Sequence, residues 1–299
     1  MEDEIIFSIV VPCFNRAYII EKTIGSLLNQ EFEKFEIIVV DDGSTDDTEE
    51  VVRRIHSNRL RYYRKSNAER AAARNYGAKL ANGKYINFFD SDDLALPNHL
   101  TEATEVIRQQ SSPEWFHLGW AIVTPAGKVK KEANSYRGTT LQAYIVDGNP
   151  LSCNGVFLRA DVIKNIEFNE DRALSGSEDY ELWYRLAARY PLYYSNIITS
   201  YVVDHDNRSV RTMEPKELVI RLNLLLNYLA TDHHVQQVFG SKLFLTKSAI
   251  YSYLALHLSE HRVSKIDSAR YLLKAAVSSR RMFVKRTYFA TIRNILIVW

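Results

Sequence analysis

The sequence predicts an α/β protein with a mostly parallel, Rossmann-like central sheet and flanking helices, followed by a C-terminal helical region. Strand-like and helix-like segments alternate over the first hundred residues, as expected of a parallel sheet with helices on its faces. From Glu214 onward the pattern is almost wholly helical, with no proline after Pro215. We therefore expect residues 1–212 to form the α/β part and residues 213–299 the helical part.

The first two strands are predicted by β-branched runs. FSIVVPCF at residues 7–14 is the first, and a helix follows it, because apolar residues recur at i, i+4, i+7 and i+8: Ile20, Ile24, Leu27 and Leu28. FEIIVVDDGS at residues 35–44 is almost continuously apolar, as expected of a strand buried on both faces. Ser44 and Asp47 then predict a capping box that opens the next helix.

Two further strands and a helix complete the alternation. LRYYRK at residues 60–65 predicts a third, peripheral strand, and the Ala-rich segment 68–83 predicts a helix with Gly83 at the C′ position. The segment KYINFFDSDD at residues 84–93 predicts the strand that follows. Three segments thus place polar or acidic groups just past the carboxyl end of a strand, the edge where open α/β sheets bind ligands.

The pattern changes from about residue 115. EWFHLGWAIVTPAGKVKKE at 114–132 predicts an antiparallel hairpin turning at residues 125–127. A short strand entering a helix is predicted at 151–163, and a helix stopped by a proline at 175–191. Residues 192–211 predict a strand followed by a polar loop.

Charge and cysteine content exclude several classes of protein. With 38 Lys and Arg against 36 Asp and Glu, the 299-residue chain has a net charge of +2, which implies no nucleic-acid partner. Two cysteines, Cys13 and Cys153, are too few for a disulfide framework and indicate a reducing compartment. The acidic N-terminus argues against a signal peptide, and no apolar run reaches the roughly 18–20 residues of a membrane span.

Two acidic clusters are candidates for chemistry. Asp90, Asp92 and Asp93 end a predicted strand, and their mutual repulsion must be compensated by a solvated turn or by a bound cation. Glu178 and Asp179 begin a predicted helix, where a helix cap would account for one of them and a general base for the other. The residues alone leave both alternatives open.

Three blocks of the sequence resemble, in order and spacing, the signature blocks of family-2 nucleotide-sugar glycosyltransferases, an inverting family with the GT-A fold. They are SIVVPCFNRAYIIEKTIGSLLNQEFEKFEIIVVDDGSTDDT, ARNYGAKLANGKYINFFDSDD and SEDYELWYRLA. The resemblance covers about residues 5–210. It implies a nucleotide-sugar half at about 1–100 and an acceptor half at about 110–212, and it leaves out the C-terminal helices.

The resemblance implies a role for each candidate residue. Asp92 would bind Mn²⁺ or Mg²⁺ together with His205, for which a structural role is the alternative. Asp90 would face the ribose, Asp93 would take either neighbouring role, and Asp179 would be the general base. Asp41 is expected to make structural hydrogen bonds only. The other expected nucleotide-sugar contacts are Pro12, Phe14, Asn15, Asp42, Arg70, Arg74 and Arg208, with a solvent-facing position as the alternative for Arg70.

The implied function is metal-dependent, inverting transfer of a sugar from a UDP-sugar or other nucleotide-sugar to an acceptor hydroxyl, in cell-surface polysaccharide or lipid-linked glycan assembly. The alternative is an inactive nucleotide-sugar-binding module of the same fold. A dinucleotide-binding oxidoreductase is disfavoured, because VPCFNR at 11–16 stands where G-x-G-x-x-G would be.

The C-terminal segment 280–299 suggests contact with a membrane surface. Five basic residues accompany an apolar stripe, Val284, Tyr288, Ile292 and Ile295. This pattern is typical of a basic amphipathic helix on an anionic membrane, and the alternative is a helix packed on its neighbours. The expected location is the cytoplasm, with peripheral contact at the inner face of the membrane.

Overall fold

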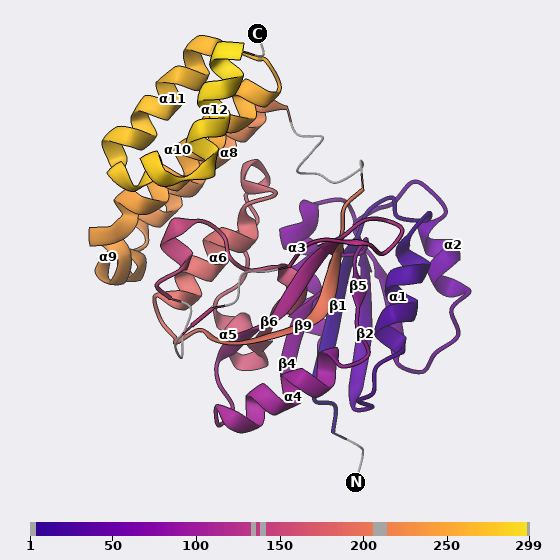
Figure 1. Cartoon of the computed structure of the whole chain (residues 1–299). Coiled ribbons are helices and arrows are strands. Elements are labelled where there is room, and N and C mark those ends of the chain that lie inside the picture. The colour runs from indigo at the N-terminus through magenta and orange to yellow at the C-terminus, as the bar shows by residue number, and fades with distance from the viewer. Residues whose placement is uncertain (1–3, 133–135, 138–141, 206–213, 298–299) are drawn as a thin grey trace.

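The computed structural model describes residues 4–132, 136–137, 142–205 and 214–297. Within these residues a nine-stranded sheet forms the centre of the α/β part (Figure 1). Its strands are β1 Phe7–Cys13, β2 Phe35–Asp41, β3 Leu60–Arg64, β4 Tyr85–Phe88, β5 Leu94–Ala95, β6 Trp115–Val123, β7 Val129–Glu132, β8 Val156–Arg159 and β9 Tyr193–Val203.

The strand order, β3-β2-β1-β4-β8-β6-β9-β5 with β7 beside β6, confirms a mostly parallel sheet. The first four strands are parallel to one another, with β1 between β2 and β4, whereas β8 runs antiparallel to both of its neighbours. The chain passes from β1 to β2 on one side and later returns to β4 on the other. The carboxyl ends of β1 and β4 therefore flank a topological switch point, where α/β sheets bind ligands.

Helices cover both faces of the sheet: α1 Ile20–Leu28, α2 Thr48–Arg53, α3 Glu69–Leu80, α4 His99–Gln109, α5 Ala160–Asn165 and α6 Glu178–Ala187. Because side chains alternate along a strand, Ile9 and Val11 of β1 share one core with α1 and α4, while Val10 shares the other with α3, α5 and α6. The predicted strands and helices of this part are confirmed in type and order.

Two details of the prediction are wrong. Ser44 does not cap α2, which begins at Thr48; its hydroxyl accepts instead from the backbone N–H of Asn15 at 2.9 Å. Gly83 is not at C′ of α3, because the helix ends at Leu80 and Ala81 is its C-cap. Gly83 is required for close packing, since a Cβ there would lie 2.5 Å from the backbone nitrogen of Ser8.

The C-terminal region is helical, as predicted, and lies beside α6 (Figure 1). Its elements are α8 Pro215–Thr231, α9 His233–Phe239, α10 Leu243–Glu260, α11 Lys265–Ser278, the 3-10 helix η5 Arg280–Val284 and α12 Arg286–Ile297. Leu225 and Leu254 share a core with Trp183 of α6, and the hydroxyls of Tyr184 and Thr246 lie 2.5 Å apart. The two parts of the chain are therefore joined by a common hydrophobic core.

The predicted apolar stripe in 280–299 is wrong at Val284, whereas Tyr288, Ile292 and Ile295 lie together in α12 as predicted. Val284 ends η5, and Lys285 is extended (φ −85°, ψ 140°), so Val284 does not share a helix face with Ile292. Residues of α12 pack against α10 instead, where Asn294 donates to the Ser259 hydroxyl at 3.2 Å. Among the described residues, no helix combines the length and apolar character needed to cross a membrane.

Candidate active site

A cavity of about 780 Å³ opens at the switch point of the sheet. It falls within the range of roughly 300–1,000 Å³ that is usual for small-molecule sites. The loops after β1 and β4 form one side, and the start of α6 contributes to its lining. Eight of the residues predicted from the sequence line this cavity: Pro12, Phe14, Asp42, Arg70, Arg74, Asp90, Asp92 and Asp179.

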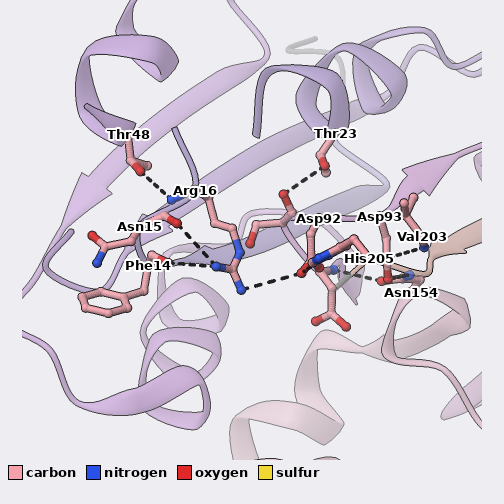
Figure 2. A network of polar contacts seen from close by, with 12 residues as sticks. Phe14, Asn15, Arg16, Thr23, Thr48, Asp92, Asp93, Asn154, Val203 and His205 are labelled. Carbon is pink, nitrogen blue, oxygen red and sulfur yellow. Dashed lines mark hydrogen bonds and ion pairs between the residues drawn. The ribbon is translucent and has the colours of Figure 1, made fainter. Parts of the chain in front are cut away.

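The loop after β1 is shaped by Asn15, which has a positive φ of 52°. Its side-chain oxygen accepts from the backbone N–H of Thr45 at 2.8 Å, so Asn15 holds the loop and does not line the cavity. The next residue, Arg16, points across the cavity toward Asp92, with 3.6 Å between Nη2 and Oδ2 (Figure 2). Arg16 was not among the residues predicted for the site, although it lies within the first of the three signature blocks.

Asp92 and His205 come together from different elements, the ends of β4 and β9. Asp92 Oδ2 lies 3.1 Å from His205 Nε2, and Nδ1 of His205 is buried and has no hydrogen-bond partner in the described structure (Figure 2). Asp92 lines the cavity and His205 does not, but an imidazole in contact with a lining carboxylate fits two ligands of Mn²⁺ or Mg²⁺. The described residues contain no group of three or more metal-ligating side chains, so substrate oxygens and water would have to complete the shell.

Asp93 does not line the cavity. Its buried carboxylate accepts from Asn154 Nδ2 at 2.7 Å and from the backbone N–H of Val203 at 2.8 Å (Figure 2). Asp93 thereby ties the end of β4 to β9, the strand that leads to His205. We infer a positioning role for Asp93, because both of its oxygens are used by the protein.

The two acids at the end of β2 differ in their surroundings. Asp41 is fully buried and makes structural hydrogen bonds, to the backbone N–H of Ser44 at 2.7 Å and to the hydroxyl of Tyr62 at 2.6 Å. Asp42 lines the cavity, where Lys65 Nζ lies 2.6 Å from its Oδ1 and the N–H of Ala68 donates to it. These two contacts fix the orientation of the Asp42 carboxylate.

Arg74 joins the two halves of the site. Its buried guanidinium donates to Asp90 Oδ1 at 2.9 Å and to Glu178 Oε1 at 2.6 Å. Burial opposes ionisation of Glu178, but the positive charges of Arg74 and Arg70 outweigh this effect and hold the pKa of Glu178 below its ordinary value. From the sequence, the only role suggested for Glu178 was that of a helix cap.

Arg208, which was predicted to contact the nucleotide-sugar, lies outside the described residues.

Asp179 lies beside this ion pair, at the first turn of α6. Its Oδ1 accepts from its neighbour's backbone N–H, that of Tyr180, at 2.6 Å, and Asn149 Nδ2 lies 3.3 Å from its Oδ2. Burial, and then the negative charge of Glu178, raise the pKa of Asp179 to about 6. A carboxylate with this pKa is ionised at neutral pH and is more basic than an ordinary aspartate, as a general base requires.

The remaining wall of the cavity comes from residues that were not among the predicted site residues. Trp120, Ile122 and Lys130 from the β6–β7 hairpin line it, together with residues 151–153 before β8. Glu69, at the start of α3, also lines the cavity and has a positive φ of 73°. Trp120, Ile122 and Lys130 belong to no recognised motif, and it is the β6–β7 hairpin that brings them to the cavity.

Comparisons with known proteins agree with this geometry. Residues 8–112 match the family model described as glycosyl transferase family 2. A glucosyltransferase from Escherichia coli, UDP-Glc:alpha-D-GlcNAc-diphosphoundecaprenol beta-1,3-glucosyltransferase WfaP, is 29% identical over 235 residues, which are 76% of this chain and 88% of that protein.

Two solved structures share the fold. Staphylococcus aureus TarS 1–349 in complex with UDP-GlcNAc has a TM-score of 0.65 at 18% identity, covering 93% of this chain and 91% of that one. The mannosyltransferase PcManGT from Pyrobaculum calidifontis, in complex with GDP-Man and Mn²⁺, has a TM-score of 0.58 at 17% identity, covering 97% and 87%. Residues 8–112 are therefore similar to glycosyl transferase family 2, and the chain shares the GT-A fold of these two solved structures.

Several relatives are much longer than this chain. Uncharacterised glycosyltransferases from Rickettsia bellii, Rickettsia felis and Rickettsia conorii match at 32%, 27% and 24% identity, over 61%, 87% and 82% of this chain. The matched regions are only 26%, 43% and 42% of those proteins. This chain therefore spans less than half of the length of these relatives.

Proposed function

We propose that this protein transfers a sugar from a UDP-sugar to a hydroxyl of a lipid-linked glycan, with inversion at C1 and with the help of a divalent metal ion. The observation that carries the proposal is a single cavity that contains both acidic sites, Asp90 and Asp92 at one strand end and Asp179 on α6. The reaction needs one site that binds the donor and another that removes the acceptor proton, and both must be within reach of a donor and an acceptor bound together.

Asp179 is the proposed general base. The acceptor oxygen attacks C1 of the donor sugar from the face opposite the diphosphate. The hydroxyl proton passes to a carboxylate oxygen of Asp179 while the bond from C1 to the diphosphate oxygen breaks, and UDP leaves. Attack from the opposite face inverts the configuration at C1. The raised pKa of Asp179, to about 6, supports this role.

The donor side would stabilise the leaving diphosphate. Asp92 and His205 would hold Mn²⁺ or Mg²⁺, which when bound would act as a Lewis acid toward the diphosphate. Arg16 and Arg70 line the same cavity and add positive charge near the leaving group. Asp42 would contact the nucleobase, where its carboxylate is held by Lys65, and Asp90 would contact the ribose.

The choice of substrates rests on the relatives. The E. coli relative is named for UDP-Glc and a diphosphoundecaprenol-linked acceptor, and TarS was solved with UDP-GlcNAc. We therefore propose UDP-hexoses as donors and undecaprenyl diphosphate-linked sugars as acceptors. The inactive nucleotide-sugar-binding module remains the second candidate, and it predicts binding without turnover.

The test measures UDP release by the purified chain with UDP-Glc, UDP-GlcNAc and GDP-Man, each with Mn²⁺, Mg²⁺ or EDTA, in the presence of a polyprenyl diphosphate-linked GlcNAc. The proposal expects release that depends on donor, acceptor and metal together. Saturable UDP binding with no release from any donor would favour the inactive module. No binding of any nucleotide would contradict both candidates.

A further inference from the structure

The last 39 residues differ in charge from the rest of the protein. Residues 261–299 contain nine Lys and Arg and a single acidic residue, Asp267. Residues 1–260 contain the other 29 basic residues and 35 acidic residues, so the two parts have net charges of +8 and −6. A chain that is nearly neutral as a whole therefore has one strongly positive end. Such asymmetry is typical of proteins that bind an anionic partner.

The positive end also exposes large aliphatic side chains. On α11, Ile266, Leu273 and Val277 are 74%, 65% and 81% exposed. Their spacing of i, i+7 and i+11 places them on one face of the helix. The opposite face of α11 packs into the bundle through Ser268 and Ala275, which are fully buried. The apolar stripe on α11 therefore faces away from the protein core.

The chain continues this surface beyond α11. Val284, at the end of η5, is 83% exposed, and Phe283 beside it is also exposed. Exposed basic side chains accompany these apolar residues: Lys265, Arg270, Lys274, Arg280, Arg281 and Arg286. We call the surface formed by Ile266, Leu273, Val277, Phe283, Val284 and these basic residues the α11 face. In Figure 1, α11 lies at the end of the helical region away from the sheet.

We propose that the α11 face binds the surface of an anionic phospholipid membrane, with the aliphatic side chains inserted at the headgroup boundary and the basic side chains on the phosphates. Aliphatic side chains flanked by Lys and Arg are the composition of interfacial helices. The proposal deepens the proposed function, since it states how the protein would meet a lipid-linked acceptor. The sequence suggested contact through residues 280–299, and the proposed surface keeps η5 from that segment and adds α11.

The charge on the α11 face argues against a second copy of the chain as the occupant. A two-fold interface places the same patch on both subunits, so the basic residues would face one another. Like charges brought together across an interface are unfavourable. A nucleic acid would satisfy the charge but not the aliphatic stripe, because nucleic-acid interfaces are polar. An anionic membrane satisfies both.

The test is flotation of the full chain with vesicles of phosphatidylcholine, with and without phosphatidylglycerol, and without any nucleotide. The proposal expects binding only to the anionic vesicles, weakened by added salt. Two variants separate the contributions: Leu273→Ser with Val277→Ser removes apolar area, and Arg280→Gln with Arg281→Gln removes charge. Each basic residue removed should weaken partitioning about fivefold.

A matched control uses exposed residues of the α/β part, Ile197→Ser with Arg53→Gln and Arg54→Gln, which should bind vesicles like the unchanged protein. UDP binding by every variant, measured by calorimetry, shows that each is folded. Failure of the unchanged chain to float with anionic vesicles would overturn the proposal. If the control substitutions weakened vesicle binding as much as those on the α11 face, the proposal would also be overturned. The same holds if gel filtration showed an oligomer that the Leu273 and Val277 substitutions dissociate.

The vesicle assay is independent of turnover. A chain that floats with anionic vesicles but transfers no sugar would contradict the proposed function and leave the membrane proposal standing. A chain that transfers sugar but never floats would contradict the membrane proposal and leave the proposed function standing.

Discussion

The guanidinium of Arg74 and the carboxylate of Glu178 form a buried ion pair, with 2.6 Å between Nη1 and Oε1. The pair joins α3 to α6, which supplies the proposed base. Asp90 shares the same guanidinium at 2.9 Å. The loop after β4 and the start of α6 are thus connected through one side chain.

Replacing Glu178 by Gln should destabilise the fold. The substitution leaves the buried Arg74 cation with one carboxylate in place of two, and breaking a buried ion pair typically costs about 3–5 kcal/mol. We expect a loss near the lower end, about 3 kcal/mol, because Asp90 remains, and denaturant unfolding measures it. The control is Glu50→Gln on α2, whose partner Arg54 is exposed and whose removal should change stability little. Equal effects of the two substitutions would contradict the structural role of the pair.

The same substitution should change the pH dependence of activity. Burial and the charge of Glu178 raise the pKa of Asp179 to about 6, so kcat/KM should rise as pH increases through about 6 and Asp179 loses its proton. In Glu178→Gln the neighbouring negative charge is absent, and the acidic limb of the profile should move to lower pH. A limb that stays in place would show that another group controls it.

Asp92→Asn should abolish the metal-dependent part of UDP binding. The carboxylate is one of two proposed ligands, and an amide is a poorer ligand for Mn²⁺. Calorimetric titration with UDP should show enhancement by Mn²⁺ in the unchanged protein and none in the variant, while binding in EDTA stays similar. The control, Asp161→Asn, changes an exposed acid on α5. Full Mn²⁺ enhancement in Asp92→Asn would refute the metal assignment.

Two buried histidines should make the protein sensitive to acid. Burial lowers the pKa of both His99 and His117 to about 3, below the value of about 6.5 expected when the chain is unfolded. Their contribution to stability is therefore complete above pH 6.5 and is lost as pH falls toward 3. In that window each histidine lowers the free energy of unfolding by about 1.4 kcal/mol for every unit of pH. Between pH 7 and pH 5 the two together lower it by roughly 4 kcal/mol.

The measurement is the free energy of unfolding at pH 7 and pH 5 for the unchanged protein, His99→Gln and His56→Gln. His99→Gln should lose about half of this dependence. His56 is exposed, and its substitution should leave the dependence unchanged. A protein equally stable at both values of pH would contradict the assignment of these histidines as neutral core residues.

The order of strands and helices could be predicted because it depends on local pattern. Residues 35–41 are buried along their whole length and read as an apolar run, and the helix periods of α1 and α6 are clear. The roles of Ser44 and Gly83 could not be predicted in this way. Tertiary contacts decide them, with Asn15 for Ser44 and with Ser8 for Gly83.

The candidate site could be predicted only in part, because some of its residues are placed by local pattern and others by tertiary contacts. Acids at strand ends follow from topology, so Asp42, Asp90 and Asp92 line the cavity as expected. Arg16 reaches Asp92 from a loop in which Asn15 has a positive φ, and the sequence pattern does not reveal this conformation. Asp93 carries the same charge as Asp92, but its position one residue on directs it to Asn154 and Val203.

The most direct test of the account compares Asp179→Asn with the unchanged protein in UDP release at saturating donor and acceptor. If Asp179 removes the acceptor proton, the variant should bind UDP-sugar with nearly unchanged affinity and turn over about 10²–10⁴-fold more slowly. Turnover equal to that of the unchanged protein would contradict the account and leave Asp179 with a structural role at the start of α6.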